Sequence, residues 1–236
     1  MAAAVDTRYR RLVESYPLVD ASPGTRFSAS GVLDKLSGLI FVVTAAGVVG
    51  AFVLPVGLAI ASIFVALGLA LAGMFKPQWA KVCAPAYAVF EGFALGAISR
   101  LYSGFGGGIV PLAVLFTGGV FLGCLVAFRT GLVKVTPRFM MITLVASLGL
   151  LVVCVASLLG LPIPGINDLG AKGMLFGIFG LGVGVLNLFV DFERVAVMER
   201  QGAAKEGEWF GALLLLTSLV LVYINILRIL ASASRR

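Results

Sequence analysis

The sequence lacks histidine altogether, and only 12% of its 236 residues are charged. Soluble domains carry about 25% charged residues, whereas 60% of this chain is apolar. A surface built at half the usual charge density would not be soluble in water. The composition therefore predicts an integral membrane protein.

The missing histidines also exclude several kinds of active site. Ser–His and Cys–His catalytic pairs, the helix-borne zinc motif and histidine proton relays all need that residue. An aspartyl intramembrane protease needs two carboxylates that share a proton, and the chain contains no GxGD sequence. Because the phosphate-binding pattern GxxxxGK[ST] is absent too, we expect neither enzymatic activity nor a cofactor.

The distribution of cysteine argues against disulfides and metal sites, and that of positive charge argues against nucleic-acid binding. Cys83, Cys124 and Cys154 lie in apolar runs without CxxC spacing, so we expect small buried side chains rather than disulfides or metal ligands. The net charge of +7 includes no basic run of five or more residues, which argues against nucleic-acid binding.

Seven apolar stretches have the length of about 20 residues that a helix needs to cross a bilayer. Pro55 separates the first two and predicts a tight helical hairpin. The expected fold is an all-α bundle of seven transmembrane helices, with residues 1–37 as a polar cytosolic tail and residues 38–236 as the membrane domain. Residues 30–36 are open to two interpretations, a short amphipathic helix or a plain linker. The predicted spans are residues 38–54, 56–75, 83–102, 109–128, 139–160, 173–195 and 209–230.

Lysine and arginine indicate the orientation, because cytosolic loops carry an excess of both. Thirteen of them flank the helix ends on the side of the N-terminus, and five flank the opposite ends. We therefore expect a cytosolic N-terminus and, after seven spans, a C-terminus on the outer side.

Several glycine pairs have the GxxxG spacing that lets helix backbones approach closely in lipid. We expect them to pack helices together rather than to bind a ligand. The pairs are Gly92/Gly96, Gly119/Gly123, Gly173/Gly177 and Gly180/Gly184.

A few polar residues fall inside the predicted spans, where an ionisable group costs about 2.5–3.5 kcal/mol and is a candidate for function. Glu91 lies in the third span and Asp191 in the sixth, one helical turn after Asn187. Ser218 and Asn225 share one face of the seventh span. A polar column built from these side chains is possible, and it would form the pH sensor and ion path.

Simpler interpretations of both acids remain open. Asp191 would stay hydrated if it began the loop that follows the sixth span, and Glu91 could be a structural acid, protonated or paired with a basic residue. Burial disfavours the charged form of a carboxylic acid, whereas a nearby cation favours it. A buried Asp191 would then change charge on modest acidification, which would be a pH switch without histidine.

Four segments together resemble the Bax inhibitor-1/YccA family, the transmembrane BAX-inhibitor-motif proteins, and most closely its bacterial branch. The resemblance covers the chain from about residue 30 to the end. It rests on residues 86–100 (AYAVFEGFALGAISR), 129–139 (RTGLVKVTPRF), 186–195 (LNLFVDFERV) and 223–230 (YINILRIL).

The resemblance implies a bundle whose seventh helix is central. Members have been regarded as pH-sensitive calcium leak channels, in which an aspartate of the sixth helix bonds to an aspartate of the seventh. Asp191 matches the first of these positions. A register anchored on Arg228 puts Ser218 at the second position, and another register would put Asn225 there.

This chain departs from that pattern at the second carboxylate, which is missing in either register. The second span also contains no charged residue, so the arginine expected near the sensor has no counterpart there. What remains is a single-carboxylate sensor at Asp191, with Glu91 on the ion path. Calcium prefers several oxygen ligands and this core offers few, so we expect transient passage of Ca²⁺ rather than a metal site.

Two functions therefore stand as hypotheses. The first is a pH-modulated calcium or cation leak in the lipid bilayer. The alternative is a non-conducting regulatory protein that binds other membrane proteins, such as the membrane-bound AAA protease that some family members regulate. Arginine outnumbers lysine, and alanine and glycine are abundant, which indicates a GC-rich bacterial genome and hence the plasma membrane.

Overall fold

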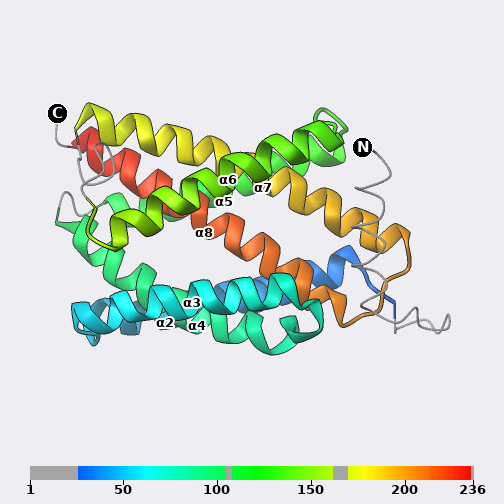
Figure 1. The fold of residues 1–236 in the computed structure, drawn as a ribbon, viewed down its shortest axis with the longest axis horizontal. Coiled ribbons are helices and arrows are strands. Elements are labelled where there is room, and N and C mark those ends of the chain that lie inside the picture. Colours follow the sequence, from blue (N-terminus) through cyan, green and yellow to red (C-terminus); the bar gives the residue numbers. More distant parts are fainter. Residues whose placement is uncertain (1–25, 105–107, 162–169, 235–236) are drawn as a thin grey trace. The chain divides into compact units, whose positions relative to one another are not determined.

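The computed structural model describes residues 26–104, 108–161 and 170–234. Within these ranges, seven helices are long and apolar enough to span a membrane (Figure 1). This confirms the predicted all-α membrane fold. The division at residue 37 stays a prediction, since most of the tail lies outside the described residues. The helices are α2 (Ala29–Phe52), α3 (Val56–Phe75), α4 (Ala80–Ser103), α5 (Ile109–Arg129), α6 (Pro137–Leu158), α7 (Ala171–Arg200) and α8 (Gly207–Ser234), and the 3-10 helix η1 (Pro77–Trp79) joins α3 to α4.

Residues with suitable backbone preferences mark the helix ends. Pro55 is the N-cap of α3, with an extended backbone (φ −68°, ψ 150°) that separates α3 from α2 as predicted. The hydroxyl of Thr136 accepts a hydrogen bond from the Phe139 amide and so caps α6. Gly131 and Gly202, with φ of +72° and +68°, follow the ends of α5 and α7 in a conformation that favours glycine.

The first span begins at Ala29, earlier than the predicted start at residue 38. Residues 30–36 form the first turns of α2 and are neither a linker nor a separate surface helix. Ser28 is the N-cap, and its side chain accepts a hydrogen bond from the Gly31 amide. The sequence prediction was late because it followed hydropathy, which rises only after these polar turns.

The described chain divides into two compact units. Unit 1 runs up to Ile98 and also contains Asp191–Thr217. Unit 2 contains Ser99–Val190 and the chain from Ser218 onwards. The helices α4, α7 and α8 each contribute one segment to each unit.

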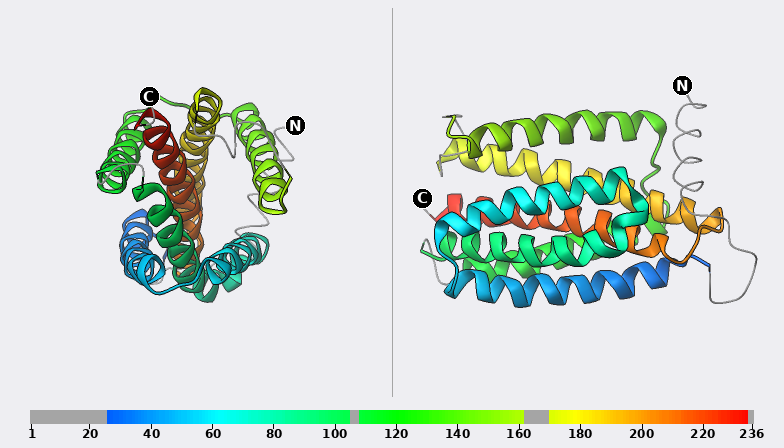
Figure 2. Two further views of the ribbon diagram at one scale, coloured as in Figure 1. Left: turned by 90° about the vertical axis from the view of Figure 1, so that its left-hand side faces the viewer. Right: turned by 60° about the horizontal axis from the view of Figure 1, so that its bottom comes forward.

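In unit 1, α2 and α4 lie side by side (Figures 1 and 2). Glycines allow this approach: a Cβ on Gly92 would come within 2.6 Å of the Ala46 side chain, and one on Gly96 would overlap the Gly47 carbonyl oxygen. From the other side, Gly50 of α2 faces the backbone of Phe93. The packing role predicted for Gly92 and Gly96 is therefore confirmed.

In unit 2, glycines of α7 face the second half of α8. A Cβ on Gly184 would lie 2.8 Å from the Val222 side chain, and one on Gly180 would overlap the amide of Asn225. The packing role predicted for this pair is confirmed as well. The prediction for Gly119 and Gly123 on α5 was wrong among the described residues, since nothing lies within 4 Å of a Cβ on either.

The last helix is the most buried of the seven. In its apolar window 78% of the residues are buried, against 11–44% in the other six spans, so most of its residues contact protein rather than lipid. Large apolar side chains such as Phe41 (75% exposed) and Phe52 (82% exposed) face outwards from α2. Such exposure is stable in lipid, which solvates apolar surface as well as the protein interior does.

The contact between α2 and α4 predicts opposite outcomes for two glycine substitutions. Gly96→Ala should destabilise the protein by about 1–3 kcal/mol, because the new methyl group overlaps the Gly47 carbonyl and the backbones must separate. Gly123→Ala, in open space, should be neutral or stabilise by up to about 1 kcal/mol, because alanine is the better helix former. Thermal unfolding of the detergent-solubilised protein measures both changes. Equal melting temperatures for the two variants would contradict the assigned contact.

Candidate functional site

Asp191 lies inside α7 and belongs to unit 1. It is 3% exposed, and its Oδ1 atom lies 3.3 Å from Nη1 of Arg194, one helical turn further along. Arg194 is partly exposed, so the ion pair connects a buried carboxylate to a side chain that reaches towards the helix end. Asp191 therefore does not begin a hydrated loop, because the helix continues to Arg200.

Glu91 is the second acid that the sequence placed inside a span, and it lies on α4 in unit 1. It is half-buried, next to Gly92, which packs on α2, and one turn from the buried Tyr87. With other described residues Glu91 forms no ion pair or hydrogen bond. The interpretation in which a basic residue neutralises Glu91 therefore has no support in the described part of the chain.

Asn187 belongs to unit 2, where it joins two helices. Its Nδ2 atom donates to the Ser147 hydroxyl of α6 at 2.8 Å and to the Val183 carbonyl at 2.9 Å. The Ser147 hydroxyl in turn donates to the carbonyl of Thr143 at 2.7 Å. Both donor hydrogens of the asparagine amide are therefore used, one in holding α6 to α7 and the other within α7 itself.

The two polar candidates of α8 lie in unit 2 and are buried, Ser218 being 5% exposed and Asn225 4%. Asn225 donates to the Leu221 carbonyl at 2.8 Å, and its amide occupies the space that Gly180 leaves open on α7. The glycine at position 180 thus makes room for this one polar side chain.

The five candidates are divided between the units, Glu91 and Asp191 in unit 1 and the others in unit 2. The chain passes from one unit to the other at Asp191 in α7 and at Ser218 in α8. The polar column that would join all five therefore stays a prediction.

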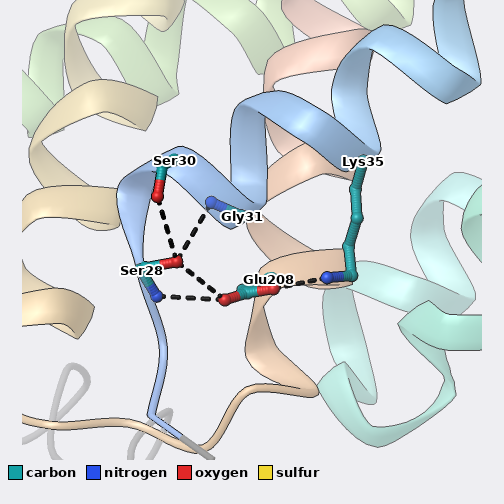
Figure 3. A network of polar contacts seen from close by, with 5 residues as sticks. All are labelled: Ser28, Ser30, Gly31, Lys35 and Glu208. Carbon is teal, nitrogen blue, oxygen red and sulfur yellow. Dashed lines mark hydrogen bonds and ion pairs between the residues drawn. The ribbon is translucent and has the colours of Figure 1, made fainter. Parts of the chain in front are cut away.

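The structure contains a polar cluster around Glu208, at the start of α8 in unit 1, that the sequence does not predict (Figure 3). Glu208 is 1% exposed. One carboxylate oxygen accepts hydrogen bonds from the amide and the hydroxyl of Ser28, each at 3.1 Å. The other oxygen forms an ion pair with Lys35, about two helical turns after Ser28.

The cluster caps α2, because the first amides of a helix have no partner within the helix. Ser28 accepts from Gly31 at 3.0 Å, and the Ala29 amide donates to Oε1 of Glu199 at 2.8 Å. Gly31 is required here, since any side chain at this position would overlap the Glu208 carboxylate. Glu199, in the last turn of α7, and Glu208, in the first turn of α8, thus complete the N-terminus of α2, where negative charge is favourable.

Local sequence patterns do not reveal this cluster. A capping box would place an acid three residues after the N-cap serine, but that residue is Gly31, and the acid comes from 180 positions further along the chain. Lys35 falls within the predicted polar tail, and Glu208 directly precedes the seventh predicted span. One residue does indicate an earlier helix start: Ser28, a preferred N-cap residue, lies ten positions before the first predicted span.

Cys83 and Cys124 are buried as expected, whereas Cys154 is half-buried, and the structure has all three as free thiols. The described residues also contain no group of three or more Cys, Asp or Glu side chains that could hold a metal ion.

Within the described residues, seven helices that are long and apolar enough to cross a bilayer define a multi-pass, all-α membrane protein. The sequence profile of the family described as "Bax inhibitor 1 like" matches residues 9–235, nearly the whole chain. The chain belongs to this family. The match extends further into the N-terminal segment than the resemblance from residue 30 had suggested. Comparison with curated proteins gives no significant match.

The buried position of Glu208 makes its substitution costly. Glu208→Ala should lower the free energy of unfolding by about 3 kcal/mol, because it leaves Lys35 and the Ser28 amide without their acceptor. Glu193→Gln, at the more exposed pair with Arg200, should cost about 0.5 kcal/mol or less.

A double-mutant cycle at the same pair measures the coupling directly. Lys35→Met combined with Glu208→Gln should recover at least about 1 kcal/mol of the summed single losses, because neither charge is then left alone. Additive losses in equilibrium unfolding would show that Lys35 and Glu208 do not interact.

Proposed function

We propose that this protein is a pH-modulated leak pathway for calcium or other cations across the membrane, with Asp191 as its sensor. The observation that carries the proposal is the burial of an ionisable aspartate within a membrane-spanning helix, at 3% exposure. Such residues are expensive in a membrane and mark ion and proton pathways. Family membership and the match of Asp191 to the sixth-helix sensor position support the same conclusion.

The Asp191–Arg194 pair would make the pathway respond to pH. The guanidinium favours the ionised carboxylate, and protonation removes the negative charge that holds Arg194 over α7. Arg194 is then free to adopt other rotamers at the end of the helix. One carboxylate and one arginine would thus replace the two aspartates of other family members.

Glu91 would provide the second negative charge along the pathway. It has no basic partner among the described residues and lies next to the closely packed contact of Gly92 with α2. A cation that leaves water needs oxygen ligands in exchange, and an isolated carboxylate supplies the strongest of them. We propose a non-enzymatic role, because the sequence contains no histidine for the catalytic pairs that need it. The arginine, alanine and glycine content supports a bacterial plasma membrane as its location.

Calcium flux into proteoliposomes tests the leak. Flux should exceed that of empty liposomes and should change between about pH 5 and pH 8, because the proposed sensor is a carboxylate in a perturbing environment. Asp191→Asn, which imitates the protonated acid, should abolish most of the pH dependence. Glu91→Gln should lower flux at every pH while preserving the pH dependence.

Glu193→Gln is the matched control for this experiment, since it removes a carboxylate two residues away on α7 that is paired with Arg200 instead. Its flux should follow the unmodified protein at each pH. Absence of flux above empty liposomes throughout this range would reject the leak function altogether.

The second candidate function is regulation of another membrane protein, such as a membrane-bound AAA protease, through the N-terminal segment. One observation favours it: the backbone just before α2 is bonded to the α7–α8 connection. The Phe27 amide donates to the Ala203 carbonyl at 2.8 Å, and Arg26 pairs with Ala204 in an isolated β-bridge. A partner that binds the tail would therefore act on the connection between α7 and α8.

Deleting residues 1–25 separates the two candidates. A regulatory protein should lose a co-purifying membrane partner, whereas its calcium flux in liposomes should remain absent. An unchanged set of partners after the deletion would count against this function.

A further inference from the structure

The turn between α3 and α4 carries an exposed tryptophan with a lysine on either side. Trp79 is 52% exposed although it is among the largest apolar side chains, and Lys76 and Lys81 are exposed too. Just beyond them, Phe75 (81% exposed) and Val82 (73% exposed) face outwards from α3 and α4. We refer to residues 75–82 as the α3–α4 turn.

The backbone of this turn is held in one arrangement. The Lys76 amide donates to the Ala72 carbonyl at 2.9 Å, and the Trp79 amide donates to the Lys76 carbonyl at 2.9 Å. Pro77 and Ala80 are buried. Trp79 is therefore exposed in a turn whose backbone is hydrogen-bonded, and its exposure does not result from fraying of a helix end.

The position of the turn along unit 1 follows from its contacts. A Cβ on Gly73, in the last turn of α3, would lie 2.5 Å from the Leu213 side chain, in the second turn of α8. The turn thus lies at the same end of unit 1 as Glu208 and the start of α2. The distribution of basic residues predicts that this end is cytosolic.

An exposed indole between lysines suits the membrane interface. Tryptophan has an apolar ring and a polar N–H group and is enriched at the level of the lipid headgroups. The Lys76 ammonium lies 4.3 Å from the Trp79 ring centroid, which keeps this cation beside the indole. The exposed Phe75 and Val82 side chains then reach the acyl chains.

The charge of the turn is uncompensated. No acidic residue occurs in the sequence between Asp34 and Glu91. Neither Lys76 nor Lys81 forms an ion pair with a described residue. Lysine binds phosphate as a point charge, and a negative headgroup is the complement that this turn lacks.

We propose that the α3–α4 turn binds an anionic phospholipid, with the headgroup phosphate held by Lys76 and Lys81 and the acyl chains against Trp79 and Phe75. The ligand class is a phosphodiester lipid with net negative charge. The site involves none of the residues proposed for the leak pathway, so it stands whether or not the protein conducts ions.

Tryptophan fluorescence tests this site, because the chain has only two tryptophans. In full-length protein carrying Trp209→Phe, Trp79 is the sole reporter. The protein is reconstituted in mixtures of phosphatidylcholine and phosphatidylglycerol, of which one or the other has brominated acyl chains. Brominated phosphatidylglycerol should quench Trp79 more strongly than its mole fraction predicts, since each lysine contributes about a fivefold preference.

Charge variants identify the source of the preference. Lys76→Gln with Lys81→Gln should reduce it to nearly equal quenching by both lipids, whereas Lys76→Arg with Lys81→Arg should retain it. Lys172→Gln, at an exposed lysine in unit 2, is the control and should leave it unchanged. Added inorganic phosphate should not compete, since it has no acyl chains.

Three results would overturn the proposal. Equal quenching by both lipids in the unmodified turn would exclude a preference for negative headgroups. A preference that survives Lys76→Gln with Lys81→Gln would place the site elsewhere. Loss of the preference on adding inorganic phosphate would indicate an anion site without lipid specificity.

Discussion

The burial of Glu208 against the first turn of α2 is the interaction on which this end of unit 1 depends. A carboxylate at 1% exposure is stable only if its lone pairs are used, and here they accept from Ser28 and Lys35. The same bonds supply acceptors that the first amides of α2 lack. One side chain therefore connects the start of the first span to the start of the last, through residues 180 positions apart.

Close helix packing follows from a second constraint, the absence of a hydrophobic driving force between helices in lipid. Helices must then gain their stability from van der Waals contact and hydrogen bonds. Gly92 and Gly96 bring the backbones of α4 and α2 together, and Gly180 admits the Asn225 amide between α7 and α8. Glycine has a helix-propensity cost of about 1 kcal/mol, which the closer contact offsets only where a neighbouring helix is present. Gly123 has no such neighbour among the described residues.

The fold was largely predictable because hydropathy and span length are properties of continuous segments. Six of the seven helix starts lay within a few residues of their prediction, whereas the start of α2 was misplaced because distant acids stabilise its polar first turn. Burial of Asp191 was likewise predictable from its apolar neighbours. The partners of Asn187 and Glu208 were not, because they depend on which helix faces which, and GxxxG spacing alone could not distinguish Gly96 from Gly123.

If the protein has the proposed leak function, the single carboxylate at Asp191 would respond to protonation differently from two facing aspartates. Two facing aspartates can share one proton, so their bond exists in an intermediate pH range and is lost when both ionise. Asp191 has an arginine partner at 3.3 Å instead. An ion pair of this kind is intact when the acid is ionised and is lost on protonation. In the proposed function, protonation of Asp191 would therefore break a bond, whereas in a pair of facing aspartates it forms one.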